Sequence, residues 1–131
     1  MKVNCIVIAV QYMKVYFSFE RKTMQKLLRH IVLFSYRDDV QPSQKSEVIR
    51  RFRELPARTG LIHELECGRN NSPEGLHHGF EDGFLVTFLS EADRAAYLPH
   101  PAHQEFVAFL STCVREALVF DYWSEESWPG K

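Results

Sequence analysis

Cysteine is scarce in this sequence and is never clustered. The 131 residues include three cysteines, Cys5, Cys67 and Cys113, and no two of them form a Cys-x-x-Cys pair. An odd number of cysteines at such wide spacing supports neither a disulfide framework nor a thiolate metal site. The pattern favours a reducing compartment, and we expect a cytoplasmic protein.

Long apolar runs and an excess of one charge are also missing. The apolar run from Cys5 to Val10 is too short to span a bilayer, and no convincing cleavage site follows it, so we expect neither a membrane anchor nor a signal peptide. The 16 Lys and Arg residues nearly balance the 17 Asp and Glu residues, and the formal net charge is −1. No basic run is long enough for a nucleic-acid stripe or a polybasic membrane patch, so neither partner is expected.

The chain is long enough for one domain with a single core. Periodic patterning begins only after Met24, so we treat residues 1–23 as an N-terminal extension outside the domain. This extension is either an extra strand or sequence upstream of a start at Met24. Residues 24–123 form the expected domain, and the polar segment 124–131 is expected to be a loose C-terminal tail.

Hydrophobic periodicity in the domain predicts strands that alternate with helices. Residues 28–36 alternate with apolar side chains on both faces, as in a strand that is covered on both sides. Pro42 begins a helix that Pro56 and Gly60 are expected to end. Ser90 opens a segment that resembles a capping box. The other expected strands span residues 61–68, 79–89 and 117–123, and the other expected helices span residues 91–97 and 101–116.

This order of elements predicts an α+β fold of the ferredoxin-like type, in which a four-stranded antiparallel sheet carries its helices on one face. The other face of the sheet is then bare. Because the strands at residues 28–36 and 82–89 carry apolar side chains on both faces, the bare face would be too apolar for an isolated monomer. We therefore expect a homodimer in which two sheets pack into a dimeric α/β barrel.

The residues best suited to chemistry lie between Tyr97 and His103. Pro101 fits the first position of a helix, because proline has the helical φ and lacks the N–H that a first turn leaves unpaired. His103 then lies in that first turn, where the free backbone N–H groups disfavour a second proton, so we expect a neutral imidazole that can act as a base. The structural alternatives are a capping or packed histidine, and a core Tyr97 whose hydroxyl bonds to His103.

Other polar residues have ordinary structural explanations. His77 and His78 are adjacent and point to opposite faces of an extended segment, and Pro101 separates His100 from the helical turn that follows, so we expect no metal site. Asp121 lies between two aromatic residues in the last strand, where a carboxylate needs a partner. We expect this partner to be an Arg or a backbone amide at the dimer interface.

Several stretches resemble a known family. They are residues 29–34, 68–76, 78–80, 87–88, 97–103 and 120–123, spread along about residues 24–123. The His-Pro-x-His element after Tyr97, together with a His near the start of the first strand, is similar to the stress-responsive dimeric α/β-barrel proteins. The resemblance implies a homodimer whose subunits each keep a cavity between helices and sheet.

The resemblance also suggests where chemistry would occur. Most members of the family have no established reaction, but one plant member is a polyketide cyclase that closes the ring of olivetolic acid without a cofactor. Its working residues correspond by position to Tyr97, His103 and His30, which are our candidate catalytic residues, although His30 also suits a structural, hydrogen-bonded role. A further pocket histidine of the plant enzyme is replaced here by Asp82. The candidate substrate-binding residues are Phe34, Asp82, Phe84 and His100, and no cofactor is expected.

These observations leave different classes of function open. The first is a small-molecule pocket with proton transfer of the cyclase or lyase type, in which His103 is the base and Tyr97 its partner. The second is a non-catalytic stress-response protein that acts as a stable dimer or a larger assembly. A weaker third is a monooxygenase-like protein, because such enzymes resemble the same barrel. A pocket that contains both Tyr97 and His103 would favour chemistry, whereas direct packing without a cavity would favour a structural role.

Overall fold

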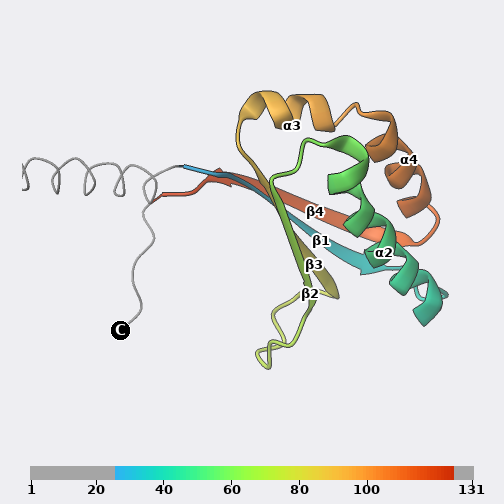
Figure 1. Cartoon of the computed structure of the whole chain (residues 1–131). Coiled ribbons are helices and arrows are strands. Elements are labelled where there is room, and N and C mark those ends of the chain that lie inside the picture. Colours follow the sequence, from blue (N-terminus) through green and yellow to red (C-terminus); the bar gives the residue numbers. More distant parts are fainter. Residues whose placement is uncertain (1–25, 126–131) are drawn as a thin grey trace, which may run out of the picture. The chain divides into compact units, whose positions relative to one another are not determined.

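The computed structural model describes residues 26–125, in which one sheet carries three helices on one of its faces (Figure 1). The expected extension at residues 1–23 and most of the expected tail at residues 124–131 lie outside the described residues. In chain order the elements are β1 Leu28–Tyr36, α2 Pro42–Thr59, β2 Glu64–Arg69, β3 Asp82–Phe88, α3 Glu91–Tyr97, α4 Pro101–Leu110 and β4 Val114–Trp123. Within this part of the chain, no helix is long and apolar enough to cross a membrane.

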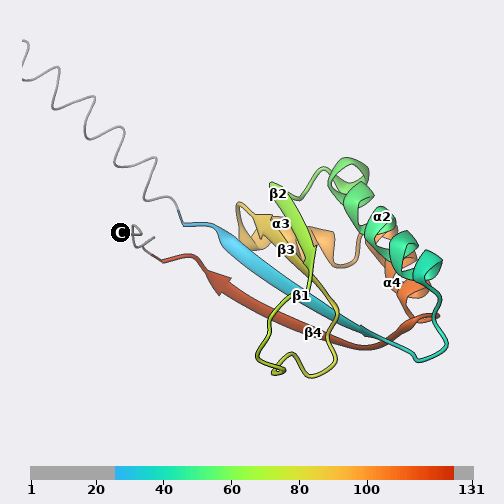
Figure 2. The same ribbon diagram turned by 90° about the horizontal axis from the view of Figure 1, so that it is seen from below.

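The strands lie in the order β2-β3-β1-β4, and each pairs antiparallel with its neighbour (Figure 2). This order confirms the predicted ferredoxin-like, α+β fold. The long strand β1 lies in the centre, and the similarly long β4 forms one edge. Leu27 and Ser124 continue the β1–β4 pairing, because the Ser124 N–H donates to the Leu27 carbonyl at 2.8 Å and the Leu27 N–H donates to the Ser124 hydroxyl at 2.8 Å.

The last helix is shorter than the sequence predicts, and the last strand begins earlier. Helix α4 ends at Leu110, not near residue 116, because two hydroxyl side chains that follow it bond back to the helix. The Ser111 hydroxyl donates to the Ala108 carbonyl at 2.6 Å, and the Thr112 hydroxyl donates to the Phe109 carbonyl at 2.7 Å. Such local bonds compete with continued helical bonding and end the helix.

Helix α2 runs through the proline that was expected to stop it. Pro56 lies inside the helix, and the helix ends at Thr59. Gly60 has a left-handed backbone with φ of 68°, and its N–H donates to the Pro56 carbonyl at 2.9 Å. The glycine is therefore the true helix stop, since its backbone conformation is one that other residues rarely adopt.

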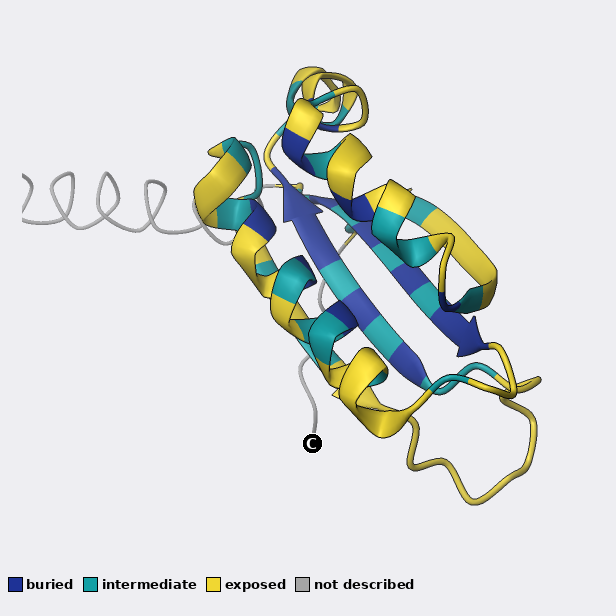
Figure 3. Ribbon diagram, turned by 90° about the vertical axis from the view of Figure 1, so that its right-hand side faces the viewer, coloured by how far each residue is buried: buried dark blue, intermediate teal, exposed yellow. Residues whose placement is uncertain are grey.

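The core lies between the helices and the alternate residues of β1 and β3 that face them (Figure 3). Phe52 of α2 stacks on Phe84 of β3 with ring centroids 4.2 Å apart, and Phe106 of α4 meets Phe52 edge-on at 5.0 Å. The helix-free face is also apolar. We call its apolar residues on the three longer strands the open-face patch: Ile31, Leu33, Leu85, Leu118, Phe120 and Tyr122.

A buried carboxylate lies at the corner of the sheet where β1 ends and β3 begins. Asp82 is 3% exposed and accepts hydrogen bonds from the Tyr36 hydroxyl at 2.6 Å and from Arg69 Nε at 3.3 Å. Burial, together with the neighbouring Asp82 carboxylate, raises the pKa of Tyr36, so its hydroxyl stays protonated and donates. Asp82 therefore ties together β1, β2 and β3.

Replacement of Tyr36 by Phe tests this arrangement. The variant leaves Asp82 buried with Arg69 as its remaining partner, so the free energy of unfolding in urea should fall by about 1 to 3 kcal/mol. Ser43→Ala is the control, because it removes a hydroxyl from an exposed position of α2, away from the open-face patch. Equal effects of the two replacements would show that the Tyr36 hydroxyl does not hold Asp82.

Candidate functional site

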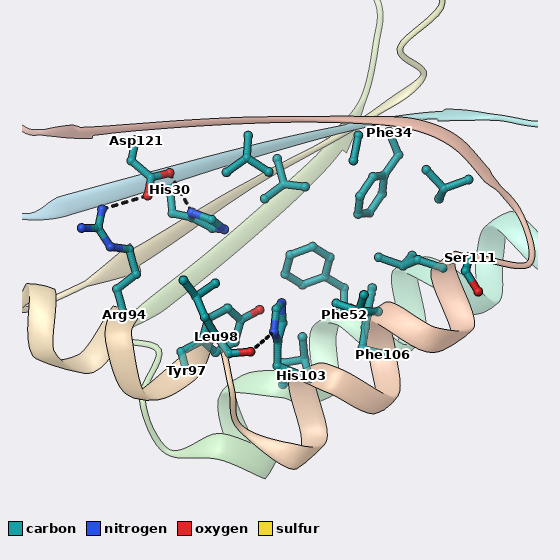
Figure 4. Close-up of a pocket in the computed structure, with 17 residues that line it drawn as sticks. His30, Phe34, Phe52, Arg94, Tyr97, Leu98, His103, Phe106, Ser111 and Asp121 are labelled. Carbon is teal, nitrogen blue, oxygen red and sulfur yellow. Dashed lines mark hydrogen bonds and ion pairs between the residues drawn. The ribbon is translucent and has the colours of Figure 1, made fainter.

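A cavity of about 670 Å³ lies between the sheet and helices α3 and α4 (Figure 4). Strands β1 and β4 form one wall, and the helices form the other. The wall is mostly apolar, with Val32, Phe34, Phe52, Leu55, Leu98, Phe106, Val107, Leu110, Val114, Ala117 and Val119. The polar lining residues are His30, Arg94, Tyr97, His103, Ser111 and Asp121. An apolar cavity with a few convergent polar groups is typical of a small-molecule site.

The turn between α3 and α4 brings Tyr97 and His103 together. Their ring centroids are 4.4 Å apart, so the chain folds back across this turn as the predicted contact requires. His100 is the N-cap of α4, where its Nδ1 accepts a hydrogen bond from the Ala102 N–H at 3.0 Å. Pro101 follows at the first helical position, as the sequence predicts.

A backbone carbonyl orients the His103 ring. His103 Nδ1 lies 2.8 Å from the carbonyl oxygen of Leu98, and this oxygen can only accept, so Nδ1 carries the hydrogen. In the neutral ring the lone pair is then on Nε2, and the ring points into the cavity from α4 (Figure 4). The geometry presents a basic nitrogen to whatever occupies the cavity.

The surroundings hold both groups in the protonation states that acid–base chemistry requires. Burial lowers the pKa of His103, and His30 and His100 lower it further, while the hydrogen bond to Leu98 opposes this shift. Desolvation therefore adds a cause for a neutral imidazole that the sequence analysis did not include. Burial also raises the pKa of Tyr97, whose side chain is 1% exposed, so its hydroxyl remains a donor.

A second histidine is held by a carboxylate. The strand register places His30 of β1 directly opposite Asp121 of β4, and His30 Nδ1 lies 2.7 Å from Asp121 Oδ1. The other oxygen of Asp121 accepts from Arg94 Nη1 of α3 at 2.9 Å. The partners expected for Asp121 at a dimer interface are therefore found within the same chain.

The remaining candidates from the sequence divide into two groups. Phe34 lines the cavity, as do the three candidate catalytic residues. Phe84 is buried in the core against Phe52, Asp82 bonds to Tyr36, and His100 caps α4, so none of these three candidates lines the cavity. Within residues 26–125, no group of three or more His, Cys, Asp or Glu side chains could hold a metal ion.

Several lining residues were not predicted from the sequence. Arg94 is one arginine among many on helical surfaces, and nothing in its spacing identifies Asp121 as its partner. Phe52 belongs to the apolar stripe of α2, a pattern that any core helix shows. Ser111 was placed inside a longer helix. Only Asp121 carried a signal, as a charged residue in an apolar strand.

The protonation of His103 can be measured directly. We expect its ring to titrate below about 6.5, the ordinary pKa of a solvated histidine, in an NMR pH titration. Because the pKa is lower in the folded state, the unfolded chain binds the proton first as the pH falls below about 6.5, and the free energy of unfolding decreases in that window. His103→Gln should remove this part of the pH dependence. A ring that titrates above the ordinary histidine pKa would contradict the desolvation that we describe.

Known proteins share both the sequence pattern and the fold. The stress-response A/B barrel domain-containing protein HS1 of Arabidopsis thaliana is 33% identical over 95 residues, which cover 72% of this chain and 87% of HS1. The hydroxynitrile lyase of Passiflora edulis superposes with a TM-score of 0.73 at 24% identity over 80% of this chain and 99% of the lyase, a likeness of fold. A dimeric ferredoxin-like protein of unknown function from Bacteroides fragilis superposes with a TM-score of 0.59 at 29% identity over 73% and 94% of the two chains.

These likenesses agree with the match of a family model along the described domain. The model of the stress responsive A/B barrel domain matches residues 28–124, from the first residue of β1 to the serine that extends the β1–β4 pairing. The chain therefore belongs to the stress responsive A/B barrel domain family.

Proposed function

We propose that this stress-response family member binds a small carbonyl compound in its cavity and catalyses a cofactor-free proton transfer of the lyase or cyclase type. One observation carries the proposal. The Tyr97 and His103 rings are in contact and line the same apolar cavity, which His30 also lines. The alternative of a purely structural motif requires direct packing, and the cavity of about 670 Å³ beside these rings favours chemistry.

His103 is the base in this proposal. Its Nε2 takes a proton from the carbon beside the substrate carbonyl, and the ring becomes an imidazolium with hydrogens on both nitrogens. The Leu98 carbonyl, already bonded to Nδ1, stabilises that charged form. A positioned base of this kind contributes a factor of about 10² to 10⁴ in rate.

Tyr97 and His30 are the polar groups that contact the substrate beside His103 in this proposal. Burial keeps the Tyr97 hydroxyl protonated, so in this proposal it donates to the substrate oxygen as negative charge develops there. His30 has its Nδ1 fixed by Asp121, and its Nε2 is the atom left to contact the substrate. Orientation by a carboxylate keeps this second ring in one tautomer.

Replacement of His103 by Gln tests the catalytic role. Wild-type protein should accelerate exchange of the α-hydrogens of 4-phenylbutan-2-one in D₂O, followed by NMR, and the variant should lose about 10²-fold or more of that acceleration. The free energy of unfolding should change by about 1 kcal/mol or less, since the ring is half-buried.

The control for this test is His63→Gln, because His63 is exposed and does not line the cavity. It should leave exchange unchanged. A His103→Gln variant that loses several kcal/mol of stability, or a wild-type protein no faster than free imidazole, would favour the non-catalytic alternative.

We also propose that the protein is a homodimer closed through the open-face patch. Directly opposed residues of this patch form continuous apolar rows, such as Leu85, Ile31 and Phe120 across three strands. Phe120 is 59% exposed and Leu118 is 41% exposed in the isolated chain, an arrangement that a partner surface would stabilise. The dimeric state of the Bacteroides fragilis relative supports the same assembly.

Phe120→Glu should convert the dimer to a monomer, because a carboxylate buried between two apolar sheet faces lacks a partner. Light scattering at micromolar concentration measures the mass. Ala108→Glu introduces the same charge on an exposed position of α4 and should leave the dimer intact. A wild-type monomer, or a variant dimer, would contradict assembly through this face.

A further inference from the structure

Two charged side chains belong to the cavity wall. Arg94 projects from α3 and Asp121 from β4, and in the described part of the chain they are the one arginine and the one carboxylate that line the cavity (Figure 4). Arg94 Nη1 and Asp121 Oδ2 are 2.9 Å apart, and both side chains are largely buried, at 28% and 23% exposure. The two charges therefore cancel at short range beside the candidate catalytic groups.

Both oxygens of Asp121 are already occupied. One accepts from His30 and the other accepts from Arg94, so the carboxylate joins an element of the sheet to a helix. Because this carboxylate pairs with Arg94, an incoming anion meets a locally neutral ion pair and not an uncompensated cation.

We infer that Asp121 determines the charge selectivity of the cavity: it cancels the charge of Arg94, so that the site accepts neutral carbonyl compounds and rejects carboxylates of the same shape. The inference rests on the proposed function, because it names the class of substrate for that site. It assigns Asp121 and Arg94 a role in specificity, separate from the proton transfer assigned to His103.

The physical reason is the cost of moving an anion out of water. A carboxylate that enters an apolar cavity loses its hydration and needs a cation or several donors in return. Here Arg94 is paired with Asp121, Tyr97 offers one hydroxyl, and the neutral His103 ring has its hydrogen on the nitrogen that faces Leu98. A neutral ketone needs just the one donor that Tyr97 supplies.

Asp121→Asn separates the two functions of this side chain. The asparagine oxygen still accepts from His30, but the amide carries no charge to cancel Arg94. Guanidinium groups bind carboxylates through two parallel hydrogen bonds, so the unpaired Arg94 becomes an anion-binding group in the cavity wall. The variant therefore changes the charge of the cavity with little change in its shape.

The test compares two ligands of the same shape, 4-phenylbutan-2-one and 3-phenylpropanoate, which differ by a methyl group in place of a carboxylate oxygen. Dissociation constants at neutral pH come from chemical-shift titration of the full chain. Wild type should prefer the ketone. In Asp121→Asn the affinity for the carboxylate should rise by about tenfold or more, while that for the ketone changes little.

Two further variants show whether the gain in carboxylate affinity depends on Arg94 and on where the negative charge is removed. In Arg94→Gln/Asp121→Asn the gain in carboxylate affinity should disappear, because the cation is gone. Glu105→Gln is the control, since Glu105 loses the same charge on the protein surface, where it pairs with Arg58, and should leave the preference unchanged.

Several results would overturn the inference. They are a wild-type preference for the carboxylate, no gain in Asp121→Asn, a gain that survives removal of Arg94, or no binding of either ligand to wild type and Asp121→Asn. These are binding measurements with the His103 base in place. If wild type does not catalyse exchange but still prefers the ketone to the carboxylate, only the proposed function is refuted. If wild type catalyses exchange but binds both ligands equally well, only the inference is refuted.

Discussion

The antiparallel pairing of β1 with β4 is the constraint on which the site depends. Its register places His30 opposite Asp121 and turns both side chains toward the helices. Because side chains alternate between the faces of a strand, a slip of β4 by one residue against β1 would turn Asp121 to the helix-free face and separate it from His30. The same register aligns Ile31 with Phe120 on that face. One set of backbone hydrogen bonds therefore determines both the cavity wall and the apolar surface opposite to it.

The helices complete the site through a short turn. Helix α3 ends at Tyr97 and α4 begins at Pro101, so the backbone between them is too short to adopt many arrangements. The Leu98 carbonyl in this turn accepts from His103 and also from the side chain of Gln104 at 2.8 Å. Because two side chains bond to the Leu98 carbonyl, this oxygen fixes the orientation of the His103 ring, although the turn is neither helix nor strand.

Patterns set by residue type could be read from the sequence, whereas competing local hydrogen bonds and contacts between distant residues could not. Strand alternation, the prolines at helix starts and the Ser90 cap depend on neighbouring residues, and the fold followed from them. The end of α4 depends on hydrogen bonds that the Ser111 and Thr112 hydroxyls donate to carbonyls of the helix. The free energy by which these bonds compete with further helical bonding is too small to be judged from residue type. The Arg94–Asp121 pair joins residues 27 positions apart, and no periodicity encodes it.

The carboxylate of Asp121 is shared between two partners, and this sharing limits how the site can evolve. Substitutions at His30, Arg94 and Asp121 act on one network, so their free energies are not additive. A change at Asp121 alone leaves Arg94 charged and partly buried, whereas a prior loss of Arg94 leaves Asp121 with His30 as its partner. The order of mutations therefore matters, and homologues that lack the acid are expected to lack the arginine as well.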